Sequence, residues 1–341
     1  MGHRRHRGCG AGANVTEADE AQAQTPLRFA RPDRRLLLAG TALATALLFS
    51  GVTPAHAQRA ITIPLSFTPV IVNNSNDCIF PGNCAFIHTA GLGAFIDLTN
   101  SGNFATAAPF SISIFTNTIS LFGSINIKNS GDLATTGFGA IGLSANTELP
   151  FSPISIVNTG DIATAGGLAY GIEAFTLTGR SSVSITNGGG IVTAGTYAIG
   201  IEAITSGTGS DISIANSGSV VTRADNAEGI RARTIGGGSD IKIVNSGNID
   251  TRGFFSDGVF GFSTGPGSSL TIQNSGRIRA AGALAYGIEA VTTGPTSPIA
   301  IENSGSVYGR SAGIYASSAT STRITADSTD RRNTLGELLC W

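Results

Sequence analysis

The chain has 341 residues, of which 41% are hydrophobic, 7% aromatic and 13% charged, and its formal net charge at pH 7 is −1. Its charged fraction is about half of the usual quarter, and 46 residues are Gly. This composition argues against a disordered tail and against a helical enzyme. The body of the chain carries no basic block, so we expect no nucleic-acid partner.

Residues 1–57 have the pattern of an extended signal-peptide region. The basic stretch RPDRR, residues 31–35, precedes an apolar run over residues 36–50, and small residues follow it. The apolar run is too short to span a bilayer comfortably, and the order of segments is typical of a secretory signal. We predict cleavage between Ala57 and Gln58 and no integral membrane segment after cleavage. The arginine pair in the basic stretch leaves twin-arginine export open beside a general secretory route.

Residues 58–95 are interpreted as an N-terminal cap with a small cysteine loop. The sequence CIFPGNC places Cys78 and Cys84 on either side of a Pro-Gly turn. In an oxidising compartment this spacing allows a disulfide, which we favour over two free thiols. A metal site would need more ligands, and none stand nearby in the sequence.

Residues 96–322 repeat themselves at a fixed interval. Asn followed two residues later by Gly recurs every 29 residues, at Asn100, Asn129, Asn158, Asn187, Asn216, Asn245, Asn274 and Asn303. Apolar residues stand four before, two before and four after each Asn, as Ile154, Ile156 and Ile162 do around Asn158. Fixed self-similarity of this length signals a solenoid.

Each repeat is predicted to contain three short strands. In the copy ISIVNTGDIATAGGLAYGIEA, residues 154–174, apolar and polar residues alternate with a period of two, which favours a strand. Interior glycines cost a helix about 1 kcal/mol each relative to Ala. We predict strands over residues 154–158, 161–165 and 169–176. About eight such 29-residue coils, stacked on one another, form an all-β, right-handed parallel β-helix.

The repeated Asn has two interpretations. Stacked one coil apart, the side-chain amides can bond to one another in a ladder, as in cross-β stacks. Alternatively, Asn tolerates the left-handed backbone of a turn. The sequence leaves both open.

Carboxylates are the only repeated residues suited to acid/base catalysis. Pairs at equal repeat positions are Glu173 with Glu202, Asp132 with Asp161, and Asp211 with Asp240. The column of Glu173 continues through Arg231 and alternates with apolar residues, so we expect it to face solvent, where stacked charges contribute little. His88 is the one histidine after the predicted signal and cannot build a Ser-His-Asp set in the cap. We therefore predict no enzyme and no catalytic, cofactor-binding or metal-binding residues.

The signal region, the CIFPGNC loop and the repeats of the form ISIVNTGDIATAGGLAYGIEA together resemble the passenger domain of a bacterial autotransporter, the type V secretion system. The resemblance covers roughly residues 57–316. It implies a right-handed β-helix displayed on a Gram-negative cell through a C-terminal outer-membrane barrel, as a surface adhesin or structural stalk. Its partners would be host or environmental glycans or proteins. The alternative is a β-helix carbohydrate-active enzyme, a polysaccharide lyase or hydrolase.

Residues 323–341 form a non-repetitive tail. It lacks the series of alternating strands that a translocator barrel needs, so we expect a truncated or frame-shifted reading frame, and a non-functional fragment of a longer gene is a further alternative. The protein would lie at the cell surface or outside the cell if it is joined to a barrel, and otherwise in the periplasm. The last coil has no evident cap, so we expect self-association through that coil.

Overall fold

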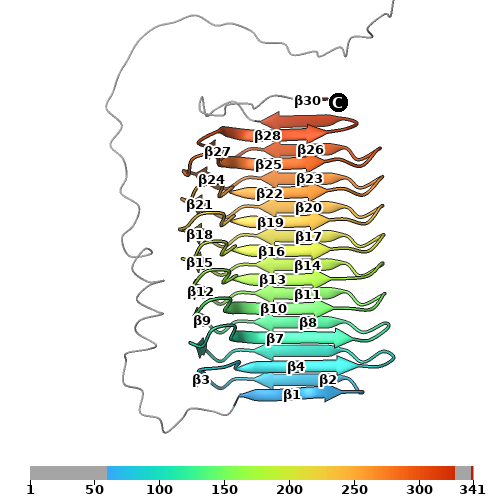
Figure 1. The fold of residues 1–341 in the computed structure, drawn as a ribbon, viewed down its shortest axis with the longest axis vertical. Helices are drawn as coiled ribbons and strands as arrows, with labels where there is room; N and C mark the ends of the chain where they lie inside the picture. The colour runs from blue at the N-terminus through green and yellow to red at the C-terminus, as the bar shows by residue number, and fades with distance from the viewer. Residues whose placement is uncertain (1–59, 327–338, 341) are drawn as a thin grey trace, which may run out of the picture.

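The computed structural model describes residues 60–326 and 339–340, and every regular element among them is a β-strand. The strands wind into a solenoid of three parallel sheets, which Figure 1 shows as a straight stack of coils. Within a coil the chain passes through sheet B, then sheet C, then sheet A. The predicted all-β parallel solenoid with 29-residue coils is confirmed.

Sheet A contains eleven strands. They are β1 (Ile61–Ser66), β4 (Ala85–Ala90), β7 (Ile112–Ile119), β10 (Ile141–Thr147), β13 (Ile172–Thr176), β16 (Ile201–Thr205), β19 (Ile230–Thr234), β22 (Val259–Ser263), β25 (Tyr286–Thr292), β28 (Ala312–Ser318) and β30 (Leu339–Cys340).

Sheet B contains ten strands and sheet C contains nine. Sheet B consists of β2 (Val70–Asn74), β5 (Ile96–Asn100), β8 (Ile125–Asn129), β11 (Ile154–Asn158), β14 (Val183–Asn187), β17 (Ile212–Asn216), β20 (Ile241–Asn245), β23 (Leu270–Asn274), β26 (Ile299–Asn303) and β29 (Thr322–Ala326). Sheet C consists of β3 (Cys78–Phe80), β6 (Phe104–Thr106), β9 (Leu133–Thr136), β12 (Ile162–Ala165), β15 (Ile191–Thr193), β18 (Val220–Thr222), β21 (Ile249–Thr251), β24 (Arg277–Ala280) and β27 (Ser306–Gly309).

The register follows the repeat interval. Ile156 of β11 pairs with Ile185 of β14, so equal repeat positions lie side by side on neighbouring strands. The apolar columns point inward and are fully buried, as Ile154, Ile162 and Ile172 are. Burial of one such side chain contributes roughly 1.5–3 kcal/mol, and only stacking on the next coil provides it.

The two ends of the solenoid differ from the prediction. Residues 61–80, assigned to a cap, form β1, β2 and β3, which pair with the next coil in the same three sheets. The repeat pattern does not predict this first coil, because Asn74 and Asn100 are 26 residues apart and not 29. At the other end, β29 pairs with β26 and β30 pairs with β28, so sheets A and B both continue beyond the last repeat.

The Asn-x-Gly turn at the corner between sheets B and C is tight because coils approach each other closely there. A Cβ added at Gly160 would lie 2.1 Å from the carbonyl oxygen of Gly131 in the preceding coil. No side chain fits in that space, so the repeat places Gly at this position in coil after coil.

Two other corners require the left-handed backbone conformation in successive coils. The column at the corner between sheets A and B is Gly93, Phe122, Phe151, Arg180, Gly209, Gly238, Gly267 and Thr296. The column at the corner between sheets C and A is Phe110, Gly139, Leu168, Tyr197, Asn226, Phe255 and Leu284. A residue other than Gly pays roughly 1–2 kcal/mol for this conformation, so the second corner stores more strain than the first.

The predicted signal region with its Ala57–Gln58 cleavage point, and most of the predicted tail, lie outside the described residues. Among residues 60–326 and 339–340, no helix has the length and apolar character needed to cross a membrane.

Candidate functional site on the outer face of sheet A

The repeated Asn side chains form a continuous buried ladder at the end of sheet B. The Nδ2 of Asn158 donates to Oδ1 of Asn187 and to the carbonyl oxygen of Gly160, both at 2.8 Å. The same pattern runs from coil to coil, and Asn74 extends it by donating to Asn100 at 2.7 Å. None of these Asn residues has a positive φ, so the ladder, and not a left-handed turn, accounts for the repeat. The ladder joins coils and leaves its amides no group for a ligand.

Cys78 and Cys84 are joined as a disulfide, with Cα atoms 5.8 Å apart. Cys84 is fully buried beside the first coils of sheet C. The bond closes the turn after β3.

The repeated Asp residues do not pair as acid and base. Oδ1 of Asp132 accepts a hydrogen bond from the backbone N–H of Asp161 at 2.9 Å, and Oδ1 of Asp161 accepts one from the N–H of Gly190 at 2.7 Å. Asp211 accepts from the N–H of Asp240 in the same way. These carboxylates, of which Asp161 and Asp211 are exposed and Asp132 is half-buried, therefore cap backbone donors of the next coil.

The expectation that the glutamate column on sheet A is exposed to solvent is wrong at Glu202. Its residues do lie on the outer face, in register across β13, β16 and β19. Yet Glu202 is only 2% exposed. Alternation along a strand indicates which face a side chain occupies but not how far its neighbours cover it, and here the long side chain of Arg231 from the next coil lies against it.

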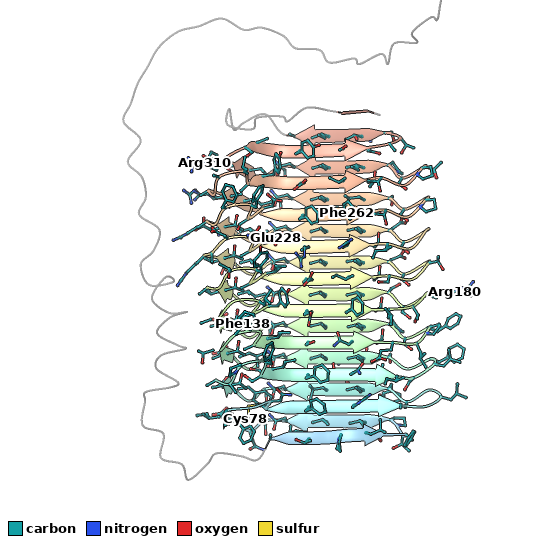
Figure 2. All side chains as sticks on the ribbon, viewed as in Figure 1. Cys78, Phe138, Arg180, Glu228, Phe262 and Arg310 are labelled. Carbon is teal, nitrogen blue, oxygen red and sulfur yellow. A yellow bond between two sulfur atoms is a disulfide. The ribbon has the colours of Figure 1, made fainter. Side chains whose placement is uncertain are left out.

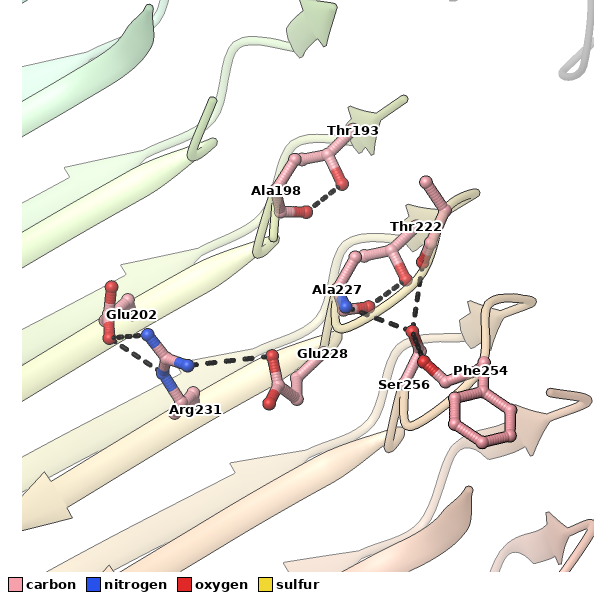
Figure 3. Close-up of polar contacts among 10 residues, drawn as sticks. Thr193, Ala198, Glu202, Thr222, Ala227, Glu228, Arg231, Phe254 and Ser256 are labelled. Carbon is pink, nitrogen blue, oxygen red and sulfur yellow. Dashed lines mark hydrogen bonds and ion pairs between the residues drawn. The ribbon is translucent and has the colours of Figure 1, made fainter. Parts of the chain in front are cut away.

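Arg231 joins two carboxylates from different positions. Its Nε and Nη2 donate to Oε1 of Glu202 at 2.7 and 2.5 Å, and its Nη1 lies 3.8 Å from Oε2 of Glu228 (Figure 3). That Oε2 atom is buried and makes no hydrogen bond within the described residues. Burial therefore outweighs the attraction of Arg231 and raises the pKa of Glu228 to about 7.

Glu173 stands one coil before Glu202. Ser144 donates to its Oε2 at 3.0 Å. Burial, together with the negative charge of Glu202, raises the pKa of Glu173 to about 6 despite that hydrogen bond. This carboxyl group is therefore partly protonated near neutral pH.

Asp257 extends the group toward the C-terminal coils. Its Oδ1 accepts the backbone N–H of Tyr286 at 2.7 Å. Burial and a hydrogen bond with the carboxylate of Glu289 raise its pKa well above the usual range for Asp. We call Glu173, Glu202, Glu228, Arg231 and Asp257 the acidic cluster.

The acidic cluster offers proton donors but few other catalytic groups. Glu202 is held in an ion pair, whereas Glu173 and Glu228 exchange protons near neutral pH. His88 lies on β4, three strands away from β13 in sheet A. Within residues 60–326 no three His, Cys, Asp or Glu side chains converge in a manner that would hold a metal ion.

Sequence reasoning found only part of this cluster. It singled out Glu173 and Glu202 but missed Glu228 and Asp257. Glu228 stands three residues before the column position of Arg231, and Asp257 stands three before that of Phe260. Glu228 and Asp257 come close to the glutamate column only when the chain folds at the corner between sheets C and A.

A separate hollow of about 530 Å³ lies on sheet B near the C-terminal coils. Gln273, Glu302 and Arg323 line it, and Gln273 donates to Glu302 at 2.9 Å. It lies on a different sheet from the acidic cluster.

Comparison of the chain with protein-family models, with curated proteins and with solved structures found no match.

Proposed function

We propose that the protein is an exported, passenger-like β-solenoid that acts at the surface of a Gram-negative cell as an adhesin or a structural stalk. The observation that carries this proposal is the regularity of the solenoid. Neighbouring sheet B strands from β5 to β26 pair in unbroken register, residue for residue. A stack without insertions builds a stiff rod, and its outward columns repeat one surface many times.

Repetition favours weak multivalent contacts over a single deep site. Coils offer similar outward Ser and Thr side chains, such as Ser130, Thr159 and Ser217, at intervals of about 4.8 Å. Several weak contacts made by one rod, or by many rods on one surface, multiply into strong attachment when geometry allows simultaneous engagement.

Binding at two surface densities tests the adhesin proposal. Full-length protein coupled to beads at low and high density is washed over immobilised glycans, mucin and matrix proteins. We expect retention on at least one surface to rise by about 100-fold or more at high density, because avidity multiplies weak affinities. Absence of retention on all surfaces at both densities contradicts the adhesin proposal.

Export is tested independently of binding. The gene is expressed in a Gram-negative host, and the protein is fractionated and its N-terminus sequenced. We expect the mature N-terminus at Gln58 in the periplasmic, surface or medium fraction. Retention of an intact leader in the cytoplasm contradicts export and favours the interpretation as a fragment of a longer gene.

The acidic cluster supports a second candidate function, carbohydrate cleavage. Glycoside hydrolysis uses one protonated and one ionised carboxyl group about 5–10 Å apart, and Glu173 and Glu228 have pKa values of about 6 and about 7. We rank this function second because Glu202, between them in the cluster, is buried and neutralised by Arg231. A screen of acidic and neutral polysaccharides, with wild type beside E173Q and E228Q, decides the matter. Cleavage by the wild type that both variants lose would establish the enzyme.

A further inference from the structure

One position of the repeated Asn-x-Gly turn carries a Gly that the fold does not require. The turn after β14 reads Asn187-Gly188-Gly189, whereas Ser or Thr stands in the middle position of the other seven repeats. Gly189 is required, because an added Cβ would lie 2.0 Å from the carbonyl oxygen of Gly160. Gly188 is exposed, its backbone is not left-handed, and an added Cβ would meet nothing closer than 3.8 Å. The fold would therefore accept Ser at position 188 as well.

The pair Asn187-Gly188 is the only Asn-Gly sequence in the chain. In an unfolded chain, Asn followed by Gly loses its side-chain amide readily, because Gly has no side chain to hinder ring closure and reaches the backbone conformations that the ring needs. The backbone nitrogen of Gly188 loses its proton and bonds to Cγ of Asn187, while the Cγ–Nδ2 bond breaks and ammonia leaves with that proton. The product is a cyclic imide, a succinimide.

Water from the solvent opens the succinimide by adding to either carbonyl carbon and breaking the bond from that carbon to nitrogen. One opening gives aspartate, and the other gives isoaspartate, in which the main chain runs through the former side chain and is one carbon longer. Aspartate places a carboxylate where the ladder needs a donor to Asn216 and Gly189. Isoaspartate also shifts the chain after β14 out of step with the neighbouring coils, which pair with this strand residue for residue. Both products therefore weaken the ladder.

The folded stack opposes this reaction. The N–H of Gly188 donates to the carbonyl oxygen of Asn158 at 2.8 Å, so the attacking nitrogen is held in a hydrogen bond. The side-chain amide of Asn187 donates to Asn216 at 2.9 Å and to Gly189 at 2.8 Å. It is fully buried and cannot turn toward the backbone nitrogen without breaking both bonds. The ladder is one of the columns in which side chains of successive coils lie over one another (Figure 2), so the reaction requires unfolding of this part of the stack.

We propose that Asn187 is a modification site that limits how long the chain can stay unfolded. A chain that folds promptly encloses the intact amide in the ladder and is protected from then on. A chain that stays unfolded loses the amide, and its stack is less stable when it folds. Gly188 sets the rate, since Ser at that position would slow ring closure. The proposal rests on the ladder and does not depend on the adhesin or stalk function.

Ageing the full-length protein in its folded and unfolded states tests the proposal. Wild type and G188S are held for matched times at mildly alkaline pH, either in buffer or in guanidinium chloride. Mass spectrometry of the peptides follows the loss of the amide at each ladder Asn, and methylation by isoaspartyl methyltransferase reports isoaspartate. Asn158 and Asn216 in the same chain are internal controls, because Thr and Ser follow them.

We expect unfolded wild type to lose the amide at Asn187 well before Asn158 or Asn216, and unfolded G188S to lose it no faster than at those controls. In folded wild type the loss at Asn187 should be at least about 1,000-fold slower than in the unfolded chain, because the open state that reacts is that rare. After refolding, the fraction of aged wild type that unfolds at lower urea concentration should equal the modified fraction. Aged G188S should unfold as fresh G188S does.

Three outcomes would overturn the proposal. The first is loss of the amide at Asn187 in folded wild type at a rate close to that in the unfolded chain. The second is equal loss at Asn187, Asn158 and Asn216 in unfolded wild type. The third is a modified fraction that unfolds at the same urea concentration as fresh protein. If aged protein does not refold, N187D, which is expressed with the aspartate already in place, gives the third result directly, and a stability equal to that of wild type overturns the proposal.

Discussion

The asparagine ladder on sheet B and the glutamate column on sheet A both place like side chains on neighbouring strands. An amide carries donors and an acceptor, so Asn158 and Asn187 satisfy each other at 2.8 Å while buried. A carboxylate only accepts, so Glu173 and Glu202 repel each other. Burial, together with this repulsion, raises the pKa of Glu173 to about 6. Stacking therefore stabilises the asparagine ladder. The glutamate column instead relies on the positive charge of Arg231 and on protonation of Glu173 to relieve the repulsion.

The largest expected effect comes from converting one column into the other. N187D places an acceptor-only group between Asn158 and Asn216, where it cannot donate to Asn216 or to Gly189. We expect the free energy of unfolding in urea to fall by about 4 kcal/mol, because a buried negative charge would face the oxygen atoms of Asn216 and Gly189, and these two acceptors would lose their donor. N303D, at the last Asn of the ladder, is the control and should lose less than half as much. Equal losses at both positions would contradict the ladder's role in joining coils.

The second-largest effect is expected from removing Arg231, the cation that pairs with Glu202 in the glutamate column. R231M leaves Glu202 buried without its cation, which we expect to destabilise the protein by about 3 kcal/mol. The double variant R231M/E202Q should recover most of that loss, since no charge remains to be compensated. A single variant as stable as wild type in thermal and urea unfolding would show that the ion pair is unimportant.

A smaller effect follows from the raised pKa values. Because the folded pKa values of Glu173 and Glu228, about 6 and about 7, exceed their ordinary value, both groups bind more protons when folded than when unfolded. Their contribution to stability is thus complete well below about pH 4.5 and is lost as the pH rises through the folded pKa values. We expect stability to fall between about pH 4.5 and pH 8, with about 2 kcal/mol from Glu173 alone. E173Q should flatten the profile, whereas stability that increases over this range would contradict the burial of these groups.

The smallest effect concerns carboxylates that stack in solvent. Asp161 caps the N–H of Gly190 and is exposed, so D161N keeps the hydrogen bond and should change stability by less than about 0.5 kcal/mol. D161A removes the cap and should lose about 1 kcal/mol in the same urea titration. A large increase in the free energy of unfolding for D161N would show that repulsion between exposed Asp side chains affects stability more than the hydrogen bonds to the backbone N–H groups.

Much of the fold could be predicted from the sequence because the 29-residue repeat sets the positions of the strands in most coils. The positions of Ile154, Ile156 and Ile162 predict strands and inward faces, and β11 has the predicted bounds while β12 begins one residue later. The third strand, β13, is shorter than predicted because residues 169–171 form the corner before sheet A.

The candidate site was predictable only in part. Strand alternation correctly places Glu173 and Glu202 outside, but it contains no information about the length of neighbouring side chains, so the burial of Glu202 beneath Arg231 was missed. The repeat likewise could not distinguish a ladder from a turn at Asn158, because both use the same residue. Bulky residues at left-handed corners run against the usual preference for Gly, so the positions of Leu168 and Phe255 give no sequence signal for that backbone.

Disulfide trapping on the outer face of sheet B tests the register of the stack most directly. Ser155 of β11 lies beside Ser184 of β14, and Ser213 of β17 lies one coil further. Neighbouring strands about 4.8 Å apart bring two Cys residues within bonding range, whereas two coils do not. The account predicts that S155C/S184C forms a disulfide under mild oxidation, detected by mass spectrometry of the peptides, and that S155C/S213C does not. Equal cross-linking of both pairs, or of neither, would contradict a stack of coils in 29-residue register.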